Sequence, residues 1–244
     1  MLTVCYHIIF HAIFLMAAIR NWGVMTNVGL KLELFGLTIR VIFQYPYLMP
    51  FYILYVLIAY LTGSIPVGIM LAKLRGADPR KIGSGNIGAT NVMRAAGKAI
   101  GILTLAGDIL KGFIPTTIAL YCGQPVAIVA LIGFAAFIGH LFPIFLKFKG
   151  GKGVATAVGV YLTISPFAIL INVVFFIFVL FKWRYVSLGS LIGTALMPLT
   201  LIVLGKSNEY IYLSLVIGLL IFIKHKKNIS RLMDGKENKI DKLL

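Results

Sequence analysis

The stretch 83–91, Gly-Ser-Gly-Asn-Ile-Gly-Ala-Thr-Asn, has residue types that suit the binding of a phosphate group. Small residues let backbone N–H groups come close to an anion, and successive N–H groups can form a concave anion site. Arg80 and Lys81 precede the stretch, and Arg94 and Lys98 follow it, so charged donors flank it on both sides. A flexible Gly/Asn turn between two membrane helices is the alternative that this stretch alone leaves open.

A second cluster, Lys-Phe-Lys-Gly-Gly-Lys-Gly at 147–153, leads directly into a helical pattern from Val154. A glycine-rich loop before a helix offers free N–H groups and the positive end of the helix dipole to an anion. It is not a Walker A loop, because the spacing differs and no Ser or Thr follows Lys152. A plain stop-transfer loop would account for the lysines but not for the glycines.

The third basic segment is 224–232, near the end of the chain. Its apolar residues Ile229 and Leu232, with Met233, indicate an amphipathic helix lying at a membrane interface. A basic tail that only sets membrane orientation is the alternative, and the segment alone favours it.

The usual catalytic patterns are absent from the sequence. No His is followed five positions later by Asp, no Gly-x-Ser-x-Gly elbow occurs, and no nucleophile–base–orienter set is evident. No cluster of His and carboxylates predicts a metal site. A reaction at these clusters would therefore rely on positioning and charge stabilisation, with a substrate group acting as its own base.

The composition identifies the class of protein that carries these clusters. Of 244 residues, 60% are hydrophobic and 12% charged, whereas soluble domains average about 45–50% and about 25%. The chain is therefore a polytopic membrane protein. Its net charge of +16 lies in short blocks at the ends of apolar runs, which fits membrane lipids and anionic headgroups and not nucleic acid.

The positions of the basic blocks predict an all-α fold with seven transmembrane helices from Phe51 onward. The run 154–181 is broken at Ser165-Pro166, and reading it as two crossings places every basic block on one side of the membrane. The fourth and fifth helices are then short. The three polar clusters share that basic side, which we expect to be the cytoplasmic side of the cell (inner) membrane.

A charged pair, Asp108 and Lys111, lies inside the apolar run 99–121. At this spacing the two side chains face the same side of a helix and can pair. A structural ion pair and a catalytic role are both open on this pattern.

Residues 1–48 differ in hydrophobic pattern from the membrane-embedded domain at 49–244. They are apolar up to Ile19 and mixed afterwards, and Met49 resembles a start site for the rest of the chain. We expect 1–48 to be an N-terminal extension outside the core, as an uncleaved anchor, an extra transmembrane helix or a surface helix.

The clusters together resemble the three signature motifs of the acyl-phosphate:glycerol-3-phosphate acyltransferases, the PlsY family. The similar segments are 83–91 with Arg94, Gly139-His140-Leu141-Phe142-Pro143 leading to 149–156, and His225 with 228–232. Gly63-Ser64-Ile65-Pro66 and 108–112 also resemble the pattern, so the match runs from about Met49 to the C-terminus.

The resemblance implies a seven-helix enzyme with its motifs on the cytoplasmic side. It implies transfer of a fatty acyl group from acyl phosphate to the 1-hydroxyl of glycerol 3-phosphate, giving lysophosphatidic acid and inorganic phosphate without a cofactor. Carried over by motif position, the catalytic residues holding the acyl-phosphate headgroup would be Ser84, Arg94, Lys149 and Asn228. The substrate-binding residues would be Gly85, Asn86, Gly88, Thr90, Asn91, His140, Gly150, Gly151, Lys152, Gly153, His225 and Arg231.

A membrane transporter for a phosphorylated solute is the alternative function. Transporters also place polar, basic sites among broken helices, but near the midplane and often between internal repeats, and the sequence has neither a repeat nor a midplane cluster. The preferred acyl chain length is not evident from the sequence, and neither is the oligomeric state, for which a monomer is the simplest expectation.

Overall fold

The computed structural model describes residues 33–34, 37–38 and 49–240 of the chain. It divides into two units, Met1–Gln44 and Tyr45–Leu244. In the first, strands β1 (Glu33–Leu34) and β2 (Leu37–Thr38) pair antiparallel, with Glu33 opposite Thr38. The other predictions for 1–48 lie outside the described residues.

Within residues 49–240, the described part of the second unit, the regular elements are all helices, which confirms the predicted all-α class. Its α-helices are α3 (Met49–Ser64), α4 (Val67–Lys73), α5 (Ala89–Ala96), α6 (Lys98–Tyr121), α7 (Val126–Leu141), α8 (Val154–Ile164), α9 (Pro166–Trp183), α10 (Val186–Val203), α11 (Asn208–Lys224) and α12 (Lys226–Met233). Two 3-10 turns, η2 (Pro79–Lys81) and η3 (Ile144–Leu146), lie in the loops that follow α4 and α7.

Within the described residues, five segments are long and apolar enough to cross a membrane. They are Phe51–Lys73, which joins α3 and α4, and then Lys98–Tyr121, Val126–Leu146, Pro166–Trp183 and Val186–Val203. A further apolar pair, α11 and α12, is bent by 62°, and α8 is a shorter apolar helix. The charge pattern indicates seven crossings, and that number stays a prediction.

Two proline breaks shape the bundle. Pro66 follows Ile65 at the break between α3 and α4, and Pro166 begins α9 directly after Ser165. The predicted division of 154–181 is therefore confirmed, and α8 has only 11 residues. The expectation of a short fifth helix is wrong: α9 has 18 residues, because it continues to Trp183 before Arg184 closes it in a left-handed conformation.

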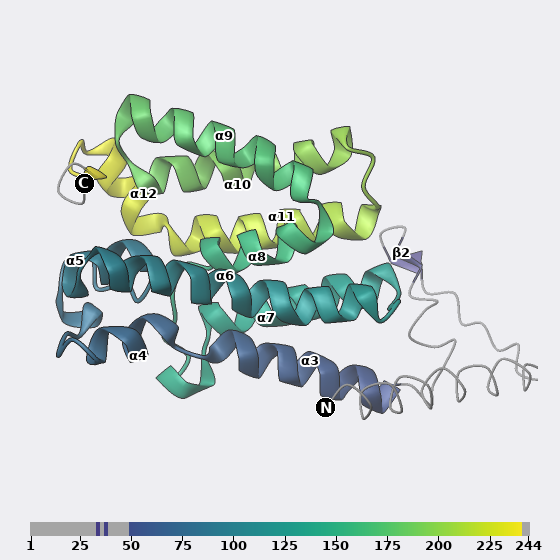
Figure 1. Ribbon diagram of the computed structural model, residues 1–244. Coiled ribbons are helices and arrows are strands. Elements are labelled where there is room, and N and C mark those ends of the chain that lie inside the picture. The colour runs from purple at the N-terminus through teal and green to yellow at the C-terminus, as the bar shows by residue number, and fades with distance from the viewer. Residues whose placement is uncertain (1–32, 35–36, 39–48, 241–244) are drawn as a thin grey trace, which may run out of the picture. The chain divides into compact units, whose positions relative to one another are not determined.

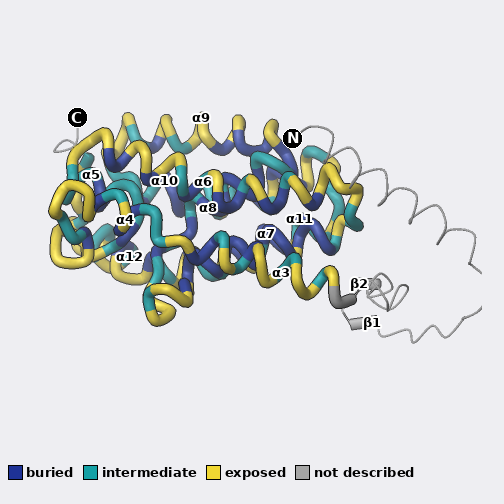
Figure 2. The backbone as a smooth tube through the Cα atoms, turned by 60° about the horizontal axis from the view of Figure 1, so that its bottom comes forward, coloured by how far each residue is buried: buried dark blue, intermediate teal, exposed yellow. Residues whose placement is uncertain are grey.

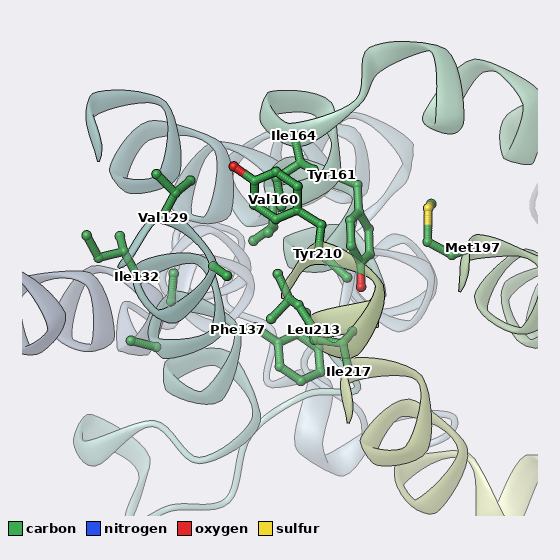
Figure 3. Close-up of a cluster of buried hydrophobic side chains, with 14 of the residues drawn as sticks. Val129, Ile132, Phe137, Val160, Tyr161, Ile164, Met197, Tyr210, Leu213 and Ile217 are labelled. Atoms are coloured by element: carbon green, nitrogen blue, oxygen red, sulfur yellow. The ribbon is translucent and has the colours of Figure 1, made fainter. Parts of the chain in front are cut away.

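The core of the bundle is built around α7, whose side chains are the most completely buried of the candidate spans. Figure 3 shows Val129, Ile132 and Phe137 of α7 packed among apolar residues of α8 and α11. Figure 2 shows that the exposed residues lie along the outer sides of the helices, with α9 strongly exposed. For a membrane protein, this exposed apolar surface is the surface that contacts lipid.

The polar segments gather at one end of the bundle. Figures 1 and 2 both place α4, α5 and α12 at the same end, although α5 and α12 are more than a hundred residues apart. The fold therefore places the first and third basic clusters at the same end, as the preference of basic residues for one side of the membrane predicts.

Candidate active site

The side chain of Asn91 holds the 83–91 loop in shape. Asn91 is 2% exposed, and its Oδ1 accepts the backbone N–H of Ser84 at 2.9 Å. Its Nδ2 donates to the carbonyl oxygens of Pro79 at 2.7 Å, Ile82 at 3.0 Å and Asn86 at 2.8 Å. Because these bonds engage both N–H groups of the amide and its oxygen, Asn91 shapes the loop.

The loop then leads into α5, whose first turn carries Thr90. Gly83 has a positive φ of 58°, and a Cβ there would lie 2.5 Å from Oδ1 of Asn91, so only glycine fits. The first turn of a helix leaves its N–H groups without intrahelical partners. Arg94 lies one turn further along α5, and within the described residues nothing pairs with its guanidinium group.

The 147–153 loop is held differently, by close packing on His140. The backbone N–H of Gly151 donates to the His140 carbonyl at 3.1 Å. A Cβ at Gly150 would collide with that carbonyl, and a Cβ at Gly151 would collide with Nε2 of the imidazole ring. These two glycines therefore permit the close packing of the loop on His140.

His140 in turn lies beside a buried ion pair. Oδ1 of Asp108 is 2.9 Å from Nζ of Lys111 and 3.5 Å from Nδ1 of His140. Lys111 also donates to the Ile65 carbonyl at 3.2 Å, at the break between α3 and α4. The predicted Asp108–Lys111 pairing is confirmed, and through His140 it supports the loop that carries Lys152.

Lys152 opens a hydrogen-bonded network that reaches the C-terminal segment. Its Nζ donates to Oδ1 of Asn228 at 2.6 Å, and Nδ2 of Asn228 donates to Oε1 of Glu237 at 2.6 Å. Nε of Arg231 donates to Oε2 of Glu237 at 2.7 Å, and the Ser187 hydroxyl donates to Oε1 at 2.8 Å. One carboxylate thus orients two of the predicted site residues on α12.

The network sets the charge of its members. Burial lowers the pKa of Lys152 to about 8, Glu237 opposes this shift, and the nearby cations Arg231 and Arg94 add to it. Burial raises the pKa of Glu237, but hydrogen bonds from Asn228, Arg231 and Ser187 outweigh that effect and leave it lowered. At neutral pH the network therefore holds a charged lysine beside a carboxylate that already has donors.

His225 lies at the junction of α11 and α12 and is 2% exposed. Its Nδ1 is 2.8 Å from the carbonyl oxygen of Ile221. A carbonyl can only accept, so Nδ1 carries a hydrogen and Nε2 of the neutral ring keeps its lone pair.

A single cavity of about 580 Å³ receives residues from all three predicted clusters. Its polar end holds Arg94, Lys152, His225, Asn228 and Arg231. From there the cavity extends as an apolar arm between α6, α8, α9, α10 and α11, lined by residues that include Leu105, Val158, Val173, Ile177 and Ile217. A charged end joined to an apolar arm suits a ligand with an anionic headgroup and a hydrocarbon chain.

The cavity lining separates the predicted site residues into two groups. Those lining it are Ser84, Asn86, Gly88, Thr90, Asn91, Arg94, His140, Lys152, Gly153, His225, Asn228 and Arg231. Gly85, Gly150 and Gly151 lie outside the lining, and so does Lys149, whose side chain is exposed. The two lysines of this loop therefore have different surroundings, although they are three residues apart.

Glu237 is the site residue that sequence reasoning missed. The sequence feature that could have indicated its role is its position as a lone carboxylate between Lys236 and Lys239, shortly after the basic helix. Asp108 also lines the cavity.

Known proteins resemble this chain closely. The family model for glycerol-3-phosphate acyltransferase matches residues 53–235. A curated glycerol-3-phosphate acyltransferase from Geotalea daltonii is 52% identical over 180 residues, covering 74% of this chain and 93% of that protein. Another, from Geobacter sulfurreducens, is 48% identical over 182 residues, covering 75% of this chain and 94% of that protein.

Solved structures agree with the sequence relatives. The crystal structure of PlsY (YgiH), an integral membrane glycerol 3-phosphate acyltransferase, in its glycerol 3-phosphate form has a TM-score of 0.75 and 43% identity, covering 77% of this chain and 94% of that chain. Its lysophosphatidic acid form has a TM-score of 0.73 with the same identity and coverage. A family match over three quarters of the sequence and the shared fold lead to one conclusion: this chain belongs to the glycerol-3-phosphate acyltransferase family.

Proposed function

We propose that this protein transfers a fatty acyl group from acyl phosphate to the 1-hydroxyl of glycerol 3-phosphate. The products are 1-acyl-glycerol 3-phosphate (lysophosphatidic acid) and inorganic phosphate, in the first acylation step of phospholipid synthesis. The observation that carries the proposal is the cavity itself, in which unpaired and networked cations from three segments meet an apolar arm.

The chemistry is electrostatic. The glycerol oxygen attacks the acyl carbon, the bond from that carbon to the phosphate oxygen breaks, and the hydroxyl proton passes to a substrate phosphate. Arg94 and Lys152 stabilise the charge that develops on the departing phosphate. We assign Lys152 the role predicted for Lys149, because Lys152 lines the cavity and Lys149 does not.

The remaining polar residues position the two substrates. Ser84, Thr90 and the first turn of α5 face the anionic groups. Asn228 and Arg231, oriented by Glu237, border the same end, and His225 offers Nε2 as an acceptor for a substrate hydroxyl. The apolar arm takes the acyl chain, so no side chain needs to form a covalent intermediate.

The direct test uses purified protein in lipid nanodiscs with palmitoyl phosphate and glycerol 3-phosphate. We expect phosphate release that matches lysophosphatidic acid formation one for one, and no product from palmitoyl thioesters. Arg94→Ala should lower turnover by roughly 10²–10³-fold, by analogy with loss of one oxyanion donor. Uptake of glycerol 3-phosphate into sealed vesicles without any product would support a transporter instead.

We further propose that the active-site end faces the cytoplasm at the cell (inner) membrane. The exposed Cys122 lies in the turn between α6 and α7, after the crossing from the basic end. In a Cys5→Ser background, an impermeant maleimide should label Cys122 from outside the cell. A cysteine placed at Lys149 should react only after the membrane is opened; labelling of both from one side would overturn the proposed topology.

A further inference from the structure

The apolar arm of the cavity has a floor to which four helices contribute. The deepest lining residues are Tyr161 of α8, Ile169 of α9, Met197 of α10 and Ser214 of α11. Figure 3 shows the Tyr161 ring on the side of the core cluster that faces Met197. The chain that enters the arm therefore meets a closed end, and this inference rests on the proposed function because that chain is the acyl group.

Helix geometry gives the depth of the floor. On α9, the lining runs from Leu180 near the charged end to Ile169, eleven residues earlier. On α10, Val186 and Met197 are also eleven residues apart, and so are Ser214 of α11 and His225 at its end. At the rise of an α-helix, each separation corresponds to about 16 Å. Three different helices thus place the floor at the same depth below the phosphate-binding end.

Asn172 is held in place in the wall of the arm. It is 6% exposed, and its Nδ2 donates to the Ala168 carbonyl at 2.8 Å and to Oγ1 of Thr200 at 3.2 Å. These bonds fix the side chain beside Met197 of α10.

Just above the floor, Gly193 keeps the arm open. It lines the cavity, and a Cβ built there would lie 3.9 Å from Oδ1 of Asn172. That spacing is ordinary contact, so the backbone does not require glycine at this position. Its missing side chain instead leaves space beside Asn172, where a larger residue would shorten the arm.

We propose that Asn172, Gly193 and Met197 set the longest acyl chain that the enzyme accepts. Gly193 provides the last free space, and Met197 closes it on α10, held by Asn172, whose Nδ2 is 3.9 Å from Sδ of Met197. A chain that ends above this level fits in the arm. A longer chain has to displace Met197.

Two substitutions on α10 test this with opposite signs. Enzyme in nanodiscs is given an equimolar mixture of saturated acyl phosphates from decanoyl to stearoyl, and products are quantified by mass spectrometry. Gly193→Val should lower the stearoyl-to-decanoyl product ratio roughly tenfold, because each excluded methylene is worth about that much. Met197→Ala should raise the ratio by opening space at the floor.

The same helix supplies matched controls. Ala195→Val makes a similar change on the exposed side of α10, and Leu199→Ala removes a side chain that is 57% exposed. Both should leave the product ratio within twofold of the unmodified enzyme. If one of the cavity variants does not fold, the direction in which the other shifts the product ratio still tests the proposal.

The outcomes separate this inference from the proposed function. An unmodified enzyme that forms product, with a chain-length ratio that neither cavity variant shifts, overturns the floor and leaves the proposed function intact. A ratio that moves equally in the control variants has the same meaning. An unmodified enzyme that forms no product from any acyl phosphate overturns both.

Discussion

The two loops at the phosphate-binding end are both rich in glycine but are held by different forces. The 83–91 loop is held by one polar side chain, since Asn91 bonds to Ser84 and Asn86 within it and to Pro79 and Ile82 before it. The 147–153 loop is held by contact, since Gly150 and Gly151 lie directly on His140. Glycine permits left-handed backbone in the first and close packing in the second. The first loop leads to Arg94 on α5 and the second contains Lys152, so each contributes a cation beside the cavity.

Of the residues in these two loops, Lys152 is the one whose substitution we expect to lower turnover the most. Lys152→Met keeps most of the side-chain length but removes the charge beside Asn228. We expect turnover of acyl phosphate to fall roughly 10²–10³-fold, because charge on the departing phosphate loses a fixed donor. Thermal unfolding should confirm a folded protein, and full turnover in a folded variant would remove Lys152 from the proposed mechanism.

Asn91 tests how the first loop is held. Asn91→Ala deletes all four hydrogen bonds and leaves buried backbone groups unpaired, which we expect to lower the free energy of unfolding by about 1–3 kcal/mol. Asn86→Ala is the matched control, since the Asn86 side chain lines the cavity and has no hydrogen bond within the described residues. It should raise the KM for substrate and leave stability unchanged; equal losses of stability would contradict the division of roles.

Gly151 tests how the second loop is held. Gly151→Ala forces a methyl group into the His140 ring, and we expect a loss of about 1–3 kcal/mol from overpacking. Removing the ring in a His140→Ala, Gly151→Ala double variant should recover part of that loss, which a double-mutant cycle measures as coupling. Strictly additive unfolding free energies would show that the contact with His140 does not hold the loop.

The pH dependence distinguishes Lys152 from Arg94 and Arg231, the two arginines that also line the cavity. Burial lowers the pKa of Lys152 to about 8, so its charge is complete below that pH and is lost above it. We expect kcat/KM to fall about tenfold per pH unit on this alkaline limb. Lys152→Arg keeps a group that stays charged, so its limb should move to higher pH; a limb that stays in place belongs to another group.

Much of this arrangement was predictable from local sequence. Basic blocks at the ends of apolar runs indicated the helical membrane fold, and Ser165-Pro166 indicated the break between α8 and α9. The convergence of the three clusters followed from their common charge, and one cavity confirms it. These features depend on short-range rules of helix formation and membrane orientation.

The direction of individual loop side chains was not predictable in the same way. In the 147–153 loop, the backbone at Lys147 and Phe148 is left-handed without glycine, and packing on His140 decides which lysine turns inward. His140 is itself placed by Asp108 of α6. Glu237 similarly acquires its role from Asn228, Arg231 and Ser187. Such roles arise from tertiary contacts that the local pattern does not contain.

Lys149 accordingly gives the smallest expected effect. Its side chain is exposed and outside the cavity lining, so Lys149→Met should change turnover less than about twofold, because solvent screens an exposed charge. Raised salt should therefore reduce whatever difference remains between Lys149→Met and the unmodified enzyme. Lys152→Met is the same substitution three residues later. Its effect differs because the packing of the loop directs Lys152 into the cavity and leaves Lys149 exposed. Comparable losses at both positions would mean that the loop rearranges when substrate binds, and Lys149 would then regain the role that its sequence position predicts.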